Sequence, residues 1–166
     1  MGTVTFANDP ITLLGNEVKI GDTAPNFNVL SNDLETVTLN DYEGKVKLII
    51  TVPSLDTGVC SEETIRFNKE ADSLNNVQVL TISMDLPFAQ TRWCGANGVK
   101  NLDTLSDHRH ADLGKNYGVL IEELRLLTRA IFVVDSDNKV TYVEYVSEAT
   151  NHPDYEKALE ATRTAK

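Results

Sequence analysis

The chain has 166 residues, the size of one ordinary domain, with 41% hydrophobic and 24% charged residues. This composition excludes a disordered chain, and no apolar run approaches the roughly 20 residues that are needed to cross a bilayer. The net charge of −10 argues against nucleic acid or an anionic membrane as a partner, because both require clustered lysine and arginine.

The first half of the chain predicts a hairpin and two buried strands with a helix between them. The segments "VTF" and "ITLLG" flank the turn-forming "ANDP" and predict a short N-terminal hairpin. The runs "VKLIITV" (46–52) and "VQVLTIS" (77–83) are rich in β-branched residues, which is typical of strands covered on both faces. Between them, Phe67, Ala71 and Leu74 recur at i, i+4 and i+7 and predict a helix that ends near "NN".

The second half predicts two short helical segments, a strand, a hairpin and a closing helix. "PFAQTRWCGANG" (87–98) predicts a short helical segment broken by Gly95 and Gly98, and "LDTLSD" predicts a third strand. "HADLGKNYG" predicts one or two helical turns, and "RAIFVVDSDNKVTYVEYV" predicts a hairpin with "DSDNK" as its turn. "HPDYEKALEATRTAK" predicts a helix with Pro153 and Asp154 at its start. We therefore expect one α/β domain over residues 1–166, with a mixed sheet flanked by helices.

Cys60 follows a segment that predicts the end of a strand and the first turn of a helix. Pro53 cannot donate a ladder hydrogen bond and so ends the strand, and Thr57 is a good N-cap residue. Cys60 then falls at the third helical position, where free N–H groups and the positive end of the helix dipole favour a thiolate. The alternative is a small buried hydrophobic side chain, because free cysteine is among the most buried residue types.

The remaining cysteine and the histidines do not indicate a metal site. Cys60 and Cys94 form no Cys-x-x-Cys pair, and His108, His110 and His152 do not have the spacing of a ligand set. We therefore expect no metal and no cofactor. The N-terminus lacks the basic patch and apolar core of a secretion signal, so a secreted disulfide framework is not indicated and the cytoplasm is the expected compartment.

Four ordered motifs give the chain a resemblance to a known family. Pro53, Thr57 and Cys60 match Pro-x-x-x-Thr-x-x-Cys, the active-site signature of the peroxiredoxins, and "GDTAPNF" resembles the segment that opens many members. "PFAQTRWC", with Cys94, and "LLTRAIFVVD", with Arg129, closely resemble the bacterial thiol peroxidase (atypical 2-Cys) subfamily, as does the N-terminal hairpin. The resemblance covers essentially the whole chain and implies a thioredoxin-like fold.

The resemblance also implies a role for each matching residue in reducing hydrogen peroxide and alkyl hydroperoxides. Cys60 would be the peroxidatic nucleophile that becomes a sulfenic acid, and Cys94 the resolving thiol that forms a Cys60–Cys94 disulfide. Thr57 would hydrogen-bond the sulfur or the peroxide, and Arg129 would supply a fixed positive charge and a donor fork. Pro53 would shield the sulfur from water. Thioredoxin would be the reductant, and the protein would be a homodimer.

Other readings of the same residues remain open at this point. Arg129 could merely pair with an acidic residue, Thr57 could be only an N-cap, and the two cysteines could form a structural bridge. A peroxide sensor that passes its oxidation to a partner protein, or a module without catalysis, would also fit. The segment around Cys94 has few expected core anchors beyond Phe88 and Trp93, and we expect both this segment and the Cys60 segment to reorganise between the dithiol and disulfide forms.

Overall fold

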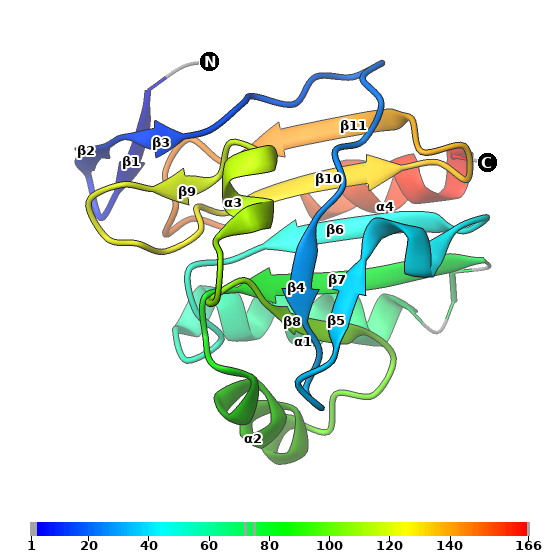
Figure 1. The fold of residues 1–166 in the computed structure, drawn as a ribbon, viewed down its shortest axis with the longest axis horizontal. Coiled ribbons are helices and arrows are strands. Elements are labelled where there is room, and N and C mark those ends of the chain that lie inside the picture. Colours follow the sequence, from blue (N-terminus) through cyan, green and yellow to red (C-terminus); the bar gives the residue numbers. More distant parts are fainter. Residues whose placement is uncertain (1–2, 72, 75, 166) are drawn as a thin grey trace.

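A seven-stranded mixed sheet forms the centre of the protein (Figure 1). The structure is a computed structural model that describes residues 3–71, 73–74 and 76–165. In spatial order, the strands are β11 (Val140–Tyr145), β10 (Ala130–Val134), β6 (Val46–Thr51), β7 (Val77–Ser83), β8 (Asp103–Ser106), β4 (Asn28–Leu30) and β5 (Thr36–Thr38). The neighbours β6, β7 and β8 run parallel, and the other pairs are antiparallel.

The two central strands β6 and β10 are buried along their whole length because both faces of the sheet are covered. Successive side chains of a strand point to opposite faces. Leu48 and Ile131 accordingly belong to the core on one side of the sheet, and Ile49 and Phe132 to the core on the other side. This explains why the sequence of these strands is continuously apolar instead of alternating.

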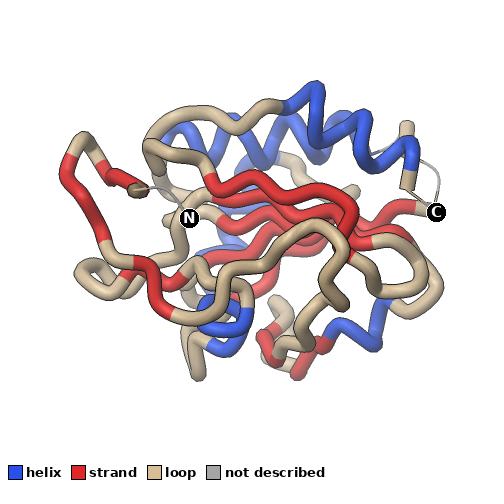
Figure 2. Tube along the Cα trace, turned by 90° about the horizontal axis from the view of Figure 1, so that it is seen from above, coloured by secondary structure: helices blue, strands red, loops and turns tan. Residues whose placement is uncertain are grey.

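The longer helices share one face of the sheet. Helices α1 (Gly58–Ala71) and α4 (Tyr155–Thr164) lie together there, as Figure 2 shows from above. Trp93 of α2 (Pro87–Asn97) joins the same core as Phe67 of α1. The opposite face is covered by the short elements η1 (Leu39–Tyr42) and α3 (Asp112–Asn116), together with the segment before β4.

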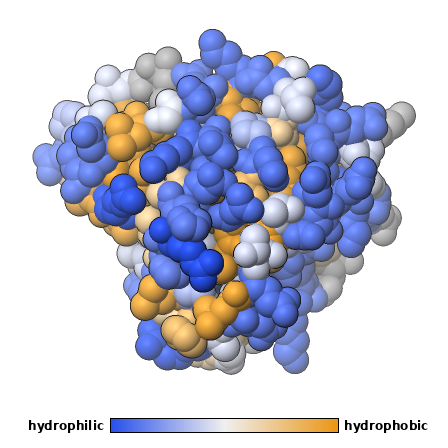
Figure 3. Space-filling view, in the orientation of Figure 1, coloured by the Kyte–Doolittle hydropathy of each residue, from blue (hydrophilic) through white to orange (hydrophobic). Residues whose placement is uncertain are grey.

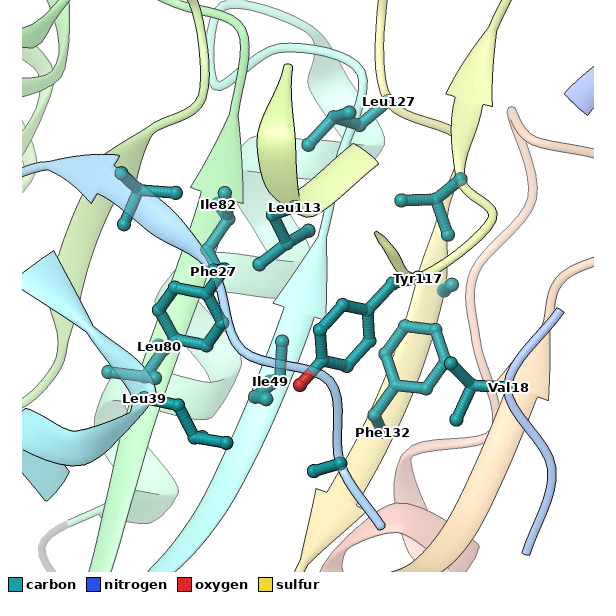
Figure 4. Packing of buried hydrophobic residues seen from close by; sticks show 14 of the residues in the cluster. Val18, Phe27, Leu39, Ile49, Leu80, Ile82, Leu113, Tyr117, Leu127 and Phe132 are labelled. Carbon is teal, nitrogen blue, oxygen red and sulfur yellow. The ribbon is translucent and has the colours of Figure 1, made fainter. Parts of the chain in front are cut away.

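The core beneath α3 is built around aromatic side chains (Figure 4). The ring of Tyr117 lies between Phe27 and Phe132, with ring centroids 6.3 Å and 5.1 Å apart respectively. Its hydroxyl group donates a hydrogen bond to the carbonyl oxygen of Pro25 over 2.7 Å, so the polar end of the buried ring is satisfied. This core fixes the sheet on the side away from Cys60.

The N-terminal hairpin packs against the segment that follows β11. Strands β1 (Val4–Phe6) and β2 (Asp9–Ile11) are antiparallel, and β3 (Leu13–Leu14) pairs with β9 (Leu120–Ile121). The backbone N–H of Thr5 donates to the carbonyl oxygen of Ser147 over 2.9 Å, and that of Ala149 donates to Thr5 over 2.8 Å. These bonds bring the end of the hairpin next to residues 147–150.

The helices and strands predicted from the sequence are confirmed, with corrections at four points. The predicted hairpin strand "ITLLG" is divided, because Ile11 ends β2 whereas Leu13–Leu14 form β3 and pair with β9. The hairpin turn consists of Ala7 and Asn8, both with positive φ, so the predicted turn residues 9 and 10 belong to β2. Helix α1 ends at Ala71, so Leu74 packs against the core from outside the helix. Gly95 lies inside α2 and does not break it, whereas Gly98 adopts the left-handed conformation that caps its end.

The surface of the face seen in Figure 1 is largely hydrophilic, and hydrophobic residues gather at its lower end over α2 (Figure 3). Within the part of the chain that the structure describes, no helix is both long and apolar enough to cross a membrane.

Candidate active site

The Cys60 thiol is buried in the first turn of helix α1. The loop that follows β6 leads into α1 at Gly58, and Cys60 is the third residue of the helix, as the sequence predicted. Its side chain has no exposed surface. The guanidinium of Arg129 donates a hydrogen bond from Nη2 to Cys60 Sγ over 3.0 Å. The sulfur therefore faces a fixed cation in a site that is closed to water.

Sheet pairing brings Arg129 to Cys60 although 69 positions separate them in the chain. Arg129 stands directly before β10, and β10 pairs antiparallel with β6 so that Ala130 lies opposite Thr51. The start of β10 thus meets the end of β6, where the loop to Cys60 begins. The Thr51 hydroxyl donates to the carbonyl oxygen of Thr128 over 2.8 Å and ties the two strand ends together.

The guanidinium of Arg129 is held by two further acceptors. Its Nη1 forms an ion pair with Glu63 Oε1, and its Nε donates to the carbonyl oxygen of Ala149 over 2.9 Å. Only 2% of the Arg129 side chain and none of the Glu63 side chain is exposed. Burial alone would lower the pKa of Arg129, but the neighbouring Glu63 and Cys60 groups raise it. Arg129 is therefore a permanent, oriented cation.

A cavity of about 300 Å³ opens beside this cluster. Its lining combines residues from four separate segments, namely Phe6, Pro53, Thr57, Gly58, Val59, Arg129, Ala149 and Thr150. Arg129 both lines the cavity and contacts Cys60 Sγ, so it connects the cavity with the sulfur. Most of the lining is apolar, with Arg129 and two threonines as its side-chain polar groups. A small molecule with a polar head and an apolar tail would fit this arrangement.

Pro53 and Thr57 flank the cavity as well, so the structure brings four of the five predicted site residues together. Pro53 is buried at the end of β6. The Thr57 hydroxyl donates to the carbonyl oxygen of Ser54 over 2.9 Å, which directs it toward its own loop. Thr57 also stands at the N-cap position, and its carbonyl oxygen accepts a bond from the N–H of Ser61 over 2.9 Å.

Cys94, the fifth predicted residue, lies in α2 and is a free thiol, as is Cys60. Its half-buried Sγ lies 3.4 Å from Thr104 Oγ1 on β8, and it packs against the same hydrophobic core to which Cys60 belongs. Each sulfur therefore has its own partner here and would have to leave it to form a disulfide. The expected anchor Trp93 is buried, but Phe88 is 69% exposed, so the expectation that Phe88 anchors this segment is wrong.

A polar network links the loop before Cys60 with the helix that carries Cys94. The Asp85 carboxylate accepts hydrogen bonds from the Ser54 hydroxyl over 2.7 Å and from the Ser83 hydroxyl over 2.8 Å. The buried side-chain amide of Gln90 donates to Ser83 Oγ over 3.1 Å. Because Gln90 lies one turn before Cys94 in α2, the network ties both cysteine segments to the end of β7.

Sequence reasoning missed Glu63, Asp85 and Phe6. Glu63 could have been identified as a neighbour of Cys60 from the sequence, because a spacing of three residues places two side chains on one helix face. Phe6 and Asp85 reach the site only through the fold. Among the described residues, no group of three His, Cys, Asp or Glu side chains is placed to hold a metal ion.

Comparison with known proteins gives consistent matches over most of the chain. The family model described as Redoxin matches residues 19–159. A thiol peroxidase of Oceanobacillus iheyensis is 69% identical over 96% of this chain and 97% of its own length, and one of Bacillus subtilis is 58% identical over 98% of each. The crystal structure of a peroxiredoxin-like protein from Aquifex aeolicus superposes with a TM-score of 0.91 at 41% identity, covering 97% of this chain and 95% of that one.

Proposed function

The chain belongs to the Redoxin family and is a peroxiredoxin of the thiol peroxidase kind, and from this membership we propose that Cys60 is the residue with which it reduces peroxides. The observation that carries the assignment is the contact between Arg129 Nη2 and Cys60 Sγ over 3.0 Å, at the start of a helix and beside an apolar cavity. A thiolate in such a place is stabilised by the guanidinium charge and by the helix dipole.

The reaction begins with attack of the Cys60 thiolate on one oxygen of the hydroperoxide. An S–O bond forms and the O–O bond breaks, so the sulfur is oxidised to a sulfenic acid while the peroxide is reduced. The departing oxygen takes up a proton and leaves as water or as an alcohol. Arg129 both lines the cavity and contacts the sulfur, so it is placed to stabilise the negative charge that moves across the O–O bond.

Pro53 and Thr57 shape the same site. The buried ring of Pro53 shields the sulfur from bulk water and so slows side reactions. Thr57 fixes the start of α1 through its bond to Ser54, and the residue lines the cavity where the peroxide would bind. Turning the Thr57 hydroxyl toward the bound peroxide would require it to leave the carbonyl oxygen of Ser54.

Cys94 completes the cycle. Its thiolate attacks the Cys60 sulfenic acid, an S–S bond forms and water leaves. The dithiol of thioredoxin then reduces the Cys60–Cys94 disulfide by exchange. The proposed partners are hydroperoxides, including alkyl hydroperoxides whose tails suit the apolar cavity, and thioredoxin. The proposed active form is a homodimer, and the cytoplasm, where thioredoxin is kept reduced, is the proposed compartment.

The test is a coupled assay that contains the protein, a hydroperoxide, thioredoxin, thioredoxin reductase and NADPH. Sustained NADPH consumption is expected for the native chain. Cys60→Ser should abolish even the first turnover, and Cys94→Ser should consume one equivalent of peroxide but stall with thioredoxin. One oxidation without recycling would instead indicate a peroxide sensor that passes oxidation to a partner, and inert thiols would contradict the proposal. Normal cycling by Cys94→Ser would refute the resolving role.

A further inference from the structure

One charged group in the buried cluster has no role in the scheme above. Glu63 lies one turn after Cys60 on the same face of α1, with no exposed side-chain surface. Its Oε1 is paired with Arg129, while its Oε2 has no hydrogen-bond partner within the described part of the chain. A buried carboxylate with one unsatisfied oxygen is costly unless something compensates for it.

The cluster contains two acids and one base. Arg129 donates to Cys60 Sγ from one nitrogen and to Glu63 Oε1 from another. If Glu63 is ionised, it already neutralises the guanidinium, and loss of the Cys60 proton leaves one uncompensated negative charge in a dry site. If Glu63 is protonated, the thiolate and Arg129 form a neutral pair. The two acids therefore compete for one cation.

The groups around Glu63 bias this competition towards the Cys60 thiolate. Besides Arg129, the charge of Glu144 on β11 acts on Glu63 and disfavours its ionised form, and Glu63 in turn acts on Tyr155 of α4. The Arg66 guanidinium lies 4.1 Å from the centre of the Tyr155 ring, but its ion pair is with Glu156. Glu62, which is exposed on α1, forms its ion pair with His152. Arg129 is thus the cation that pairs directly with Glu63.

We propose that Glu63 is a positioning residue that orients Arg129 and competes with the Cys60 thiolate for its charge, so that the proton on Glu63 sets the pH range in which Cys60 reacts. This inference rests on the proposed role of Cys60. Burial raises the pKa of Glu63 to about 7 against the opposing charge of Arg129, which places its proton exchange in the range where thiols are activated.

The proposal predicts that removing the charge of Glu63 while keeping its shape makes Cys60 easier to ionise. Glu63→Gln keeps an acceptor oxygen for Arg129 Nη1 and removes the competing anion. Glu62→Gln is the matched control, because it removes the same charge from the adjacent residue, whose side chain is 71% exposed. Both substitutions are made in a Cys94→Ser background, so that Cys60 is the single thiol.

The measurement is the rate of Cys60 alkylation by iodoacetamide as a function of pH, with peroxide consumption followed in parallel. Glu63→Gln should move the midpoint of the profile down by about one pH unit, which is about a tenfold gain in rate below the midpoint. Glu62→Gln should leave the midpoint in place. An unmoved midpoint in Glu63→Gln, an equal shift in both variants, or a uniform loss of rate at every pH would overturn the proposal.

A second measurement does not require the Glu63 variant to fold. In the Cys94→Ser protein, at a pH where Cys60 is ionised, alkylation removes the competing thiolate and should let Glu63 ionise beside Arg129. The infrared difference spectrum should then show loss of a protonated carboxyl band and gain of a carboxylate band. A spectrum without these bands contradicts the inference. Alkylation does not depend on peroxide chemistry, so failure of the proposed function would appear separately, as a Cys60 thiol that reacts with iodoacetamide but, when left unalkylated, consumes no peroxide.

Discussion

Replacing Arg129 by lysine separates the charge of this side chain from its geometry. The guanidinium reaches three acceptors at once, namely Cys60 Sγ, Glu63 Oε1 and the carbonyl oxygen of Ala149. A lysine ammonium keeps the positive charge but cannot span all three from one nitrogen. One ammonium must then serve both Glu63 and the Cys60 sulfur, so we expect the sulfur to lose its hydrogen bond in the protonation state in which Glu63 is ionised.

The size of the effect follows from the one bond that the sulfur loses. A hydrogen bond to a charged group contributes about 1.5–3 kcal/mol. If this energy is fully expressed in the transition state, the second-order rate constant with hydrogen peroxide falls by about tenfold to about 150-fold. Loss of the bond to Ala149 removes about 1 kcal/mol from the free energy of unfolding in addition.

The assay is the stopped-flow rate of peroxide reaction with the fully reduced protein, alongside its denaturant unfolding. Arg92→Lys is the matched control, because the Arg92 side chain is 73% exposed. Its ion pair is loose, with 3.7 Å between Arg92 Nη2 and Oδ2 of the exposed Asp56. We expect the control to react within about twofold of the native protein, as exposed ion pairs contribute little. A folded Arg129→Lys protein that reacts as fast as the control would refute the assigned role of the guanidinium fork.

Three further outcomes are expected. Phe6→Ala should weaken binding of a bulky organic hydroperoxide by about fivefold or more and leave the reaction with hydrogen peroxide unaffected, because Phe6 lines the cavity. Equal effects on both substrates would show that Phe6 is not part of the substrate site. Ser54→Ala should speed formation of the Cys60–Cys94 disulfide about fivefold, because the hydrogen bond from the Ser54 hydroxyl to Asp85 is lost. The rate is followed by Trp93 fluorescence, and a slower rate would contradict the idea that the network restrains the two cysteine segments. Burial raises the pKa of Asp107 to about 6, so the free energy of unfolding should fall as the pH rises from about 4 to about 6, and Asp107→Asn should flatten that slope.

The elements with strong local patterns or clear turn signals were predictable from the sequence, whereas the short strands β4, β5 and β9 were not. The runs 46–52 and 77–83 form the buried strands β6 and β7 that their composition indicates. Strands β4 and β5 have three residues each, too few for a period of two to be recognised, and they exist because β8 offers β4 a free edge. Gly95 stays helical because Gln90 and Trp93 anchor α2 to the core, and such contacts override the weak helix propensity of glycine.

The candidate site also has a part that the local sequence predicts and a part that only the fold brings together. The loop from Pro53 to Cys60 is continuous in the chain, so its turn and helix start could be deduced residue by residue. The nearness of Arg129 to Cys60 depends on the register of β10 against β6, which no local pattern encodes; the family resemblance supplied it. Glu63 stands in "SEET", a polar stretch that is typical of a solvent-facing helix; its spacing from Cys60 indicates a shared helix face, but its burial and its pairing with Arg129 depend on the fold.

The desolvation free energy of the buried Glu63–Arg129 pair argues that the pair is functional. Desolvating a carboxyl group and a guanidinium is expensive, and well-packed hydrophobic residues in place of a buried ion pair are often neutral or stabilising. Glu63 and Arg129 are both almost fully buried, and one Glu63 oxygen has no partner among the described residues, so the pair is poorly explained as a stabilising device. Its geometry is better explained by the sulfur, because the same guanidinium that Glu63 orients also contacts Cys60. A fold that needed only stability would have lost little by giving up both charges, whereas a thiolate in a buried site needs the positive charge of Arg129.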